Sequence, residues 1–159
     1  PTNCFFFSEK DIFAAHKTSG WNFDGKITYD IADINEGAGF NKQTGKFRAP
    51  EGGTYGFTFS GRTGGTSSTW VCVYKDGNQH HVSADSNEVW GNNINSIWIM
   101  ELSQGEEVYL EVTYGQLYAS SNVPVIFTGN LLKLDDCAFL HTPIVSSPNL
   151  TLTKIRCLV

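Results

Sequence analysis

Large aromatic rings recur at every second position in the segment 53–60. Tyr55, Phe57 and Phe59 alternate there with Gly, Thr and Ser. Because successive side chains of an extended strand point to opposite faces, this spacing places three rings on one face. Each ring contributes roughly 1.5–3 kcal/mol when it is fully buried. The segment therefore predicts a strand that supplies much of the core of a β-sheet.

Other segments repeat this period of two. They are Val71 and Val73; Trp98, Met100 and Leu102; and Val108, Leu110 and Val112. Glycine turn signals separate the segments: Asp24-Gly25, Thr44-Gly45, Gly52-Gly53, Gly64-Gly65, Asp76-Gly77 and Gln104-Gly105. Gly45 and Gly53 are expected to supply turn dihedrals that other residues avoid. Short strands with glycine turns predict an all-β sandwich or jelly roll, interrupted by a long loop from Ser83 to Asn95.

Length and charge narrow the class of protein. A chain of 159 residues is expected to form one domain. The longest apolar runs are shorter than the ~20 residues of a membrane span, so no span is predicted. A net charge of -5 argues against nucleic acid as a partner.

Several motifs occur in one order along the chain. They are Asn35, Phe40-Asn41, Thr44-Gly45-Lys46-Phe47, Pro50, the ring alternation ending at Phe59, Gly105-Glu106-Glu107-Val108 and Phe127-Thr128-Gly129. Together they resemble the complement C1q globular domain family over about residues 12–132. The chain departs from the family pattern at Gly56, Glu106 and Asn130.

The resemblance implies a ten-stranded jelly roll like that of the tumour necrosis factor superfamily. It also implies a compact homotrimer and a secreted, non-enzymatic recognition module. Residues 1–11 and 133–159 lie outside the resemblance, and we expect them to be extensions, the second packing on the domain. The sequence contains no Gly-X-Y repeat, so we expect a head without a collagen stalk.

No residue pattern indicates catalysis. No Ser, His and acid triple has recognisable flanks, and the adjacent His80 and His81 should point to opposite faces of a strand. We therefore predict that the protein is not an enzyme. Some C1q relatives hold calcium through carboxylates, and Asp30, Asp33 and Glu36 are the candidate calcium ligands here.

Two tryptophans are assigned different roles. Trp98 shares its parity with Met100 and Leu102 and should lie in the core. Trp90 stands among amides and carboxylates, a composition typical of sugar-binding surfaces. The candidate ligand residues are Trp90, Asp85, Asn87, Glu88, Asn92 and Asn93. The alternative is that Trp90 anchors its loop on the core.

The four cysteines contain no CxxC pair, which is unlike a zinc site. They are either two disulfides of a secreted protein or buried thiols of a cytosolic one. The sequon at Asn149 favours secretion and glycosylation. The resemblance implies that the start of the first strand lies beside the end of the last, so that Cys4 and Cys137 could approach each other, with Cys157 as a competing partner for either. We expect Cys4–Cys137 and Cys72–Cys157 bridges, although four cysteines permit three pairings and the sequence does not decide among them.

The leading hypothesis is a homotrimeric pattern-recognition lectin of innate immunity that binds extracellular glycans or microbial ligands by avidity. One alternative is a cytokine-like ligand that binds a receptor. Another is a structural component of extracellular matrix or biomineral.

Overall fold

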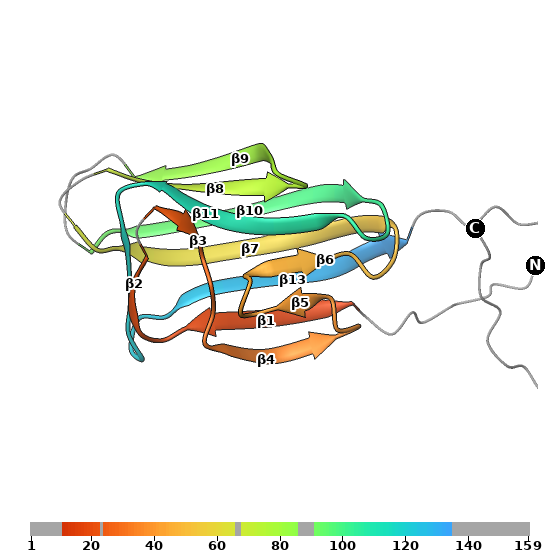
Figure 1. The fold of residues 1–159 in the computed structure, drawn as a ribbon, viewed down its shortest axis with the longest axis horizontal. Coiled ribbons are helices and arrows are strands. Elements are labelled where there is room, and N and C mark those ends of the chain that lie inside the picture. The colour runs from red at the N-terminus through yellow and green to blue at the C-terminus, as the bar shows by residue number, and fades with distance from the viewer. Residues whose placement is uncertain (1–10, 23, 66–67, 86–90, 135–159) are drawn as a thin grey trace, which may run out of the picture.

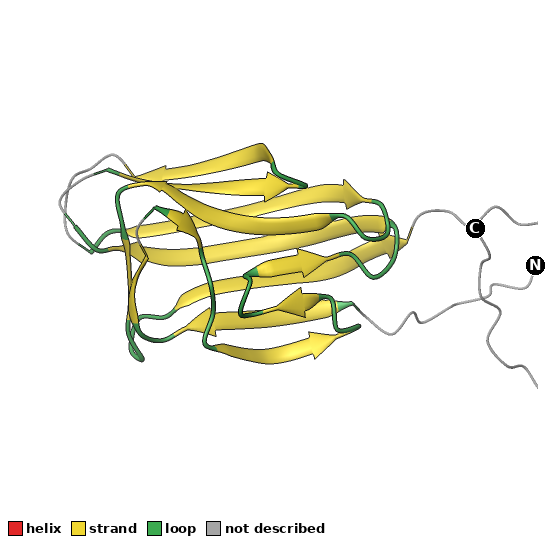
Figure 2. Ribbon diagram, viewed as in Figure 1, coloured by secondary structure: helices red, strands yellow, loops and turns green. Residues whose placement is uncertain are grey.

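The computed structural model describes residues 11–22, 24–65, 68–85 and 91–134, and these form strands joined by loops (Figure 2). The strands are β1 (Ile12–Lys17), β2 (Gly20–Asn22), β3 (Gly25–Lys26), β4 (Ile31–Glu36), β5 (Phe40–Asn41), β6 (Lys46–Arg48), β7 (Gly53–Thr63), β8 (Thr69–Lys75), β9 (Asn78–Asp85), β10 (Asn93–Leu102), β11 (Glu107–Tyr114), β12 (Leu117–Ala119) and β13 (Val125–Leu134). The described part thus has thirteen strands where ten were expected. Five of them, β2, β3, β5, β6 and β12, are only two or three residues long.

The strands form two antiparallel sheets packed face to face (Figure 1). The first sheet has the order β2-β12-β7-β13-β1-β4, and β10 also pairs with β7. The second sheet has the order β5-β6-β11-β8-β9, and β3 also pairs with β11. This arrangement confirms the all-β sandwich expected from the alternation of apolar residues.

Aromatic rings from both sheets fill the space between them. The predicted core residues Phe47, Tyr55, Phe57, Phe59 and Phe127 are all at most 2% exposed. Trp98 is also buried, as expected, and its ring stacks on that of Phe57 with centroids 5.6 Å apart. Stacked and edge-to-face ring pairs add about 0.5–1.5 kcal/mol each beyond the burial of area.

Two glycines permit close approaches in the region of the family's central motif. Gly45 has φ +68°, and a Cβ there would overlap the carbonyl oxygen of Ile27. Gly53 was expected to supply a turn dihedral, but it starts β7 without a positive φ. It is required because a Cβ would overlap the carbonyl oxygen of Lys133 on the adjacent β13.

Element boundaries differ from the expectation in two places. The predicted loop from Ser83 to Asn95 is too long, because residues 83–85 belong to β9 and residues 93–95 to β10. Strand β13 continues through Leu134, two residues beyond the expected end of the domain. No helix long and apolar enough to cross a membrane occurs in the described residues.

The first and last strands of the domain lie side by side. Ile12 on β1 pairs with Asn130 on β13, and the Leu131 N–H donates to the Asp11 carbonyl at 2.8 Å. This is the strand neighbourhood implied by the resemblance. Cys4 and Cys137, whose bridge was expected from it, lie outside the described residues.

Candidate functional site

The predicted ligand loop is only partly described. Trp90, Asn87 and Glu88 lie outside the described residues. Asp85 ends β9, where its backbone pairs with Thr69, and Asn93 begins β10 opposite Arg62. The Asn92 N–H donates to Thr63 Oγ1 at 3.0 Å, so the backbone at the end of the loop is held against β7.

The expected calcium ligands do not converge. Thr18 donates its N–H to Asp30 Oδ2 at 2.8 Å, and the Asp33 carboxylate contacts His16 Nδ1 at 2.8 Å. The Thr18 hydrogen bond lowers the pKa of Asp30 below its ordinary value. Within the described ranges, no group of three His, Cys, Asp or Glu could hold a metal ion. Asp30 and Asp33 therefore make local contacts within one copy of the domain, and the calcium site of Asp30, Asp33 and Glu36 stays a prediction.

The adjacent histidines His80 and His81 lie on β9, and both are exposed. His81 Nε2 lies 3.0 Å from Ser96 Oγ on β10, and its ring stacks near Trp98 with centroids 6.2 Å apart. His81 thus links the edges of the two sheets, a contact that sequence spacing alone does not reveal.

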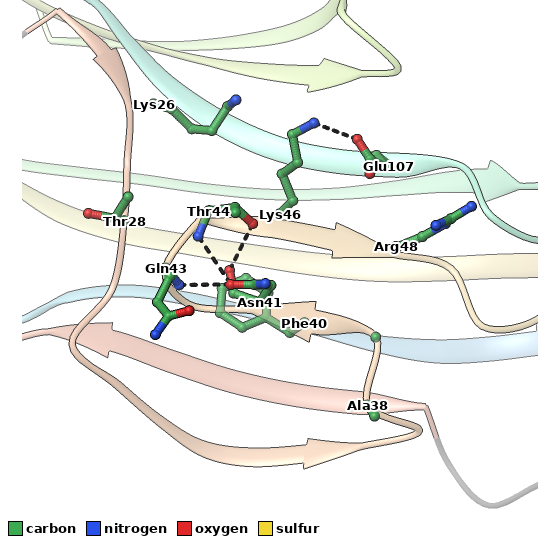
Figure 3. Close-up of a pocket in the computed structure, with 11 residues that line it drawn as sticks. Lys26, Thr28, Ala38, Phe40, Asn41, Gln43, Thr44, Lys46, Arg48 and Glu107 are labelled. Carbon is green, nitrogen blue, oxygen red and sulfur yellow. Dashed lines mark hydrogen bonds and ion pairs between the residues drawn. The ribbon is translucent and has the colours of Figure 1, made fainter.

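An open depression of about 660 Å³ lies beside the β5–β6 hairpin (Figure 3). Its lining includes Lys26 of β3, Lys46 and Arg48 of β6, and Glu107 of β11. Lys46 Nζ and Glu107 Oε2 form an ion pair of 2.6 Å, which raises the pKa of Lys46. The depression is open to solvent, and it resembles a contact surface more than an enclosed catalytic pocket.

Much of the polar capacity of this depression is used locally. Asn41 Oδ1 accepts hydrogen bonds from the backbone N–H groups of Gln43 and Thr44 at 3.0 and 3.2 Å. Arg48 Nε donates to the Gly105 carbonyl at 3.2 Å. These bonds hold the hairpin turn, so the depression is first of all a structural feature.

An aliphatic face covers the outside of the first sheet. Ile97 and Ile99 on β10 are 78% and 64% exposed, and Leu132 on β13 is 52% exposed. Ile99 pairs with Gly56 on β7, and Leu132 Cδ1 lies 3.2 Å from where a Cβ on Gly56 would stand. Ile99 and Leu132 therefore lie beside a position without a side chain, and Ile97 continues the face along β10 opposite Thr58.

Sequence analysis missed this face, although a signal was present. In β10 the alternation of Trp98, Met100 and Leu102 was recognised from the sequence. Ile94, which is also buried, has the same parity. Ile97 and Ile99 occupy the opposite parity, where a half-exposed strand would carry polar residues. A strand that is apolar on both faces is typical of one that is covered on both.

The C1q domain model matches residues 12–132 of the chain. This chain belongs to the C1q domain family. The match has the boundaries inferred from the motifs, and C1q and tumour necrosis factor domains typically trimerise and are typically non-enzymatic.

Named relatives agree with this assignment. The C1q domain described here is similar to human multimerin-1, with 31% identity over 131 residues, 76% of this chain and 10% of that protein. Mouse multimerin-1 is 29% identical over 124 residues, again 76% of this chain and 10% of that protein. The chain thus spans about a tenth of the length of these curated relatives.

Solved structures share the fold of this C1q domain. The globular domain of zebrafish complement 1qA has a TM-score of 0.66 and 16% identity, and the match covers 79% of this chain and 99% of that one. Murine APRIL has a TM-score of 0.60 and 15% identity, with 76% and 99% covered. Eiger TNF from S. frugiperda has a TM-score of 0.55 and 14% identity, with 84% and 99% covered.

One of the four cysteines, Cys72, lies within the described residues. Cys72 on β8 is a buried free thiol, and its Sγ lies 3.1 Å from Thr113 Oγ1 on β11. The partner proposed for Cys72 lies outside the described residues, so the Cys72–Cys157 bridge stays a prediction. Cys157 and Asn149 lie outside the described residues.

Proposed function

We propose that this C1q domain is a secreted, non-enzymatic recognition module that assembles as a homotrimer and binds carbohydrate or microbial surface ligands by avidity. The observation that carries the proposal is the aliphatic face of Ile97, Ile99 and Leu132. Contiguous exposed apolar patches on soluble domains mark association surfaces. A head-to-tail contact that closes after three copies would bury this face on each copy.

Trimerisation supplies the mechanism of recognition. A shallow surface site binds a single sugar weakly, but three copies on one rigid trimer raise the effective strength when the spacing of ligands matches. The open form of the depression beside β5–β6 is in keeping with a protein that contacts its ligand without enclosing it.

The proposal extends to the two flanking segments, residues 1–11 and 133–159, which we expect to pack on the domain. A Cys4–Cys137 bridge would hold them there and would stabilise the fold by about 2–4 kcal/mol. The pairing of Ile12 with Asn130 supports this, because both segments leave the domain at adjacent strands.

Two measurements test the function. Light scattering coupled to size exclusion gives the mass of the assembly, and a glycan array is then probed with the assembled protein. The expected results are a mass near three times 17.6 kDa and binding to at least one glycan class. A monomer would remove the avidity mechanism. A trimer that bound a cell-surface protein without inhibition by glycans would contradict the lectin role and favour a receptor ligand.

A further inference from the structure

Two aromatic side chains lie exposed and adjacent on the outside of the second sheet. Trp70 on β8 and Tyr114 on β11 are cross-strand partners, and they are 48% and 56% exposed. Their ring centroids are 6.4 Å apart with an interplanar angle of 61°. Val82 on β9, 38% exposed, pairs with Cys72 on β8 and therefore lies diagonally across from Trp70. We call these three side chains the aromatic platform.

The platform faces away from both the core and the aliphatic face. Val71 and Val73 on β8 are 1% exposed and belong to the core, so Trp70, of opposite parity, points outward from the second sheet. The aliphatic face belongs to the first sheet. In a trimer assembled through the first sheet, the platform therefore stays accessible on each of the three copies.

The size of the platform limits its occupant. An aromatic side chain buries about 150–250 Å² when enclosed, so two half-exposed rings and one valine offer about 300 Å². A stable protein interface needs about 800 Å² on each partner. The area suits one or two sugar rings, whose C–H groups stack on aromatic faces.

The polar neighbours of the platform match the hydroxyl groups of a sugar. Tyr114 contributes its own phenol, and Thr113 is exposed beside it. Glu111 pairs with Cys72 on the same outward face, one step along the sheet from the rings. Glu111 also pairs with Lys26 on β3, so this part of the sheet carries one charge of each sign, and a neutral sugar is favoured over an anionic one on a chain with a net charge of -5.

We propose that Trp70 and Tyr114 form a binding platform for the pyranose ring of a neutral glycan. This inference rests on the proposed lectin function and deepens it by placing the ligand on the second sheet. The predicted ligand loop begins at Asp85, whose backbone pairs with Thr69, the neighbour of Trp70. The platform thus lies at the end of the sheet where that loop starts.

The test uses the whole chain and an array of neutral oligosaccharides of mannose, galactose, glucose and N-acetylglucosamine. Trp70→Ala and Tyr114→Ala should each weaken binding by about tenfold or more, as expected when a stacking ring is lost. Tyr114→Phe, which keeps the ring, should retain most of the affinity. Tyr74→Ala is the matched control, because Tyr74 lies on the same strand and the same face as Trp70, and it should stay within about twofold of the wild type.

A second measurement does not depend on a folded alanine variant. In a ¹H–¹⁵N spectrum, the indole signal that disappears in Trp70→Phe identifies Trp70, and a bound oligosaccharide from the array should shift it. Glycan binding with an unmoved Trp70 signal and unchanged affinity of Trp70→Ala would overturn the platform while leaving the lectin function in place. A trimer that bound no oligosaccharide would overturn both.

Discussion

The phenolic oxygen of Tyr55 lies 3.2 Å from Oδ2 of Asp11 and 2.8 Å from the carbonyl oxygen of Glu51. Asp11 is 4% exposed, and burial raises the pKa of its carboxyl above the ordinary value. The first described residue of the chain is therefore tied to the longest strand of the first sheet. Because this polar contact is enclosed, its strength depends on the protonation of Asp11.

The first prediction concerns the pH dependence of this contact. A folded-state pKa above the unfolded value of about 3.9 means that the contribution of Asp11 is fully present below that value and is lost as pH rises through the folded-state pKa. Asp11→Asn should therefore gain stability relative to the wild type between about pH 4 and pH 7. Urea unfolding of both proteins across that range measures the difference, and a difference that falls with pH would contradict the assignment.

The aliphatic face yields a prediction about assembly. Ile99→Glu places a charge at the centre of the face, where a trimer would have to bury it without a partner, and it should yield monomers. Val82→Glu is the control, because it adds the same charge to an exposed aliphatic site on the other sheet and should leave the trimer intact. Light scattering distinguishes the two, and an unchanged mass for Ile99→Glu would move the interface elsewhere.

Replacing Gly45 or Gly77 by alanine distinguishes the cost of backbone strain from the cost of a steric overlap. Both have positive φ, +68° and +81°, but a Cβ on Gly77 has no atom within 4 Å, whereas one on Gly45 overlaps the Ile27 carbonyl. Gly77→Ala should destabilise by about 1 kcal/mol, the strain of the backbone alone. Gly45→Ala should cost at least about 2 kcal/mol, since the turn must also shift. Equal denaturation midpoints would show that the turn at Gly45 yields without cost.

Cys72 should behave as an enclosed thiol. It is 2% exposed, so alkylation should be slow in the native protein and rapid after unfolding without reductant. Peptide mapping after alkylation in the two states identifies the residue directly. Recovery of a Cys72–Cys157 disulfide peptide from unreduced protein would contradict the free thiol and confirm the pairing inferred from the family resemblance.

Asp30 should stabilise the turn that follows β1. Its carboxylate accepts the Thr18 N–H at 2.8 Å, and this bond lowers the pKa of Asp30. The contribution is present above the unfolded-state pKa and is lost as pH falls through the lowered folded-state value. Asp30→Ala should cost about 1 kcal/mol at pH 7 and less under acidic conditions. Thermal unfolding at pH 7 and pH 3 tests both, and an equal loss at the two values would exclude the charge as the cause.

The alternation of apolar residues correctly predicted strands and core residues wherever one face of a strand is buried. The alternation of Tyr55, Phe57 and Phe59 indicated the longest strand, and the same parity placed Trp98 in the core. The same pattern did not predict contacts between strands that are far apart in the sequence. Gly53 is needed because β13 passes close to it, and no local signal at Gly53 contains that information.

The candidate surfaces likewise combine features that the sequence predicts with contacts that only the tertiary structure shows. Parity and composition determined from the sequence alone that this chain forms an antiparallel sandwich with an aromatic core, and the order of its motifs indicated the C1q family. Only the tertiary structure decided that Ile99 and Leu132 lie beside Gly56, that Trp70 meets Tyr114, and that Asp30 and Asp33 contact Thr18 and His16. The period of a strand specifies which way a side chain points, whereas its neighbours depend on strand order and register, which long-range pairing sets.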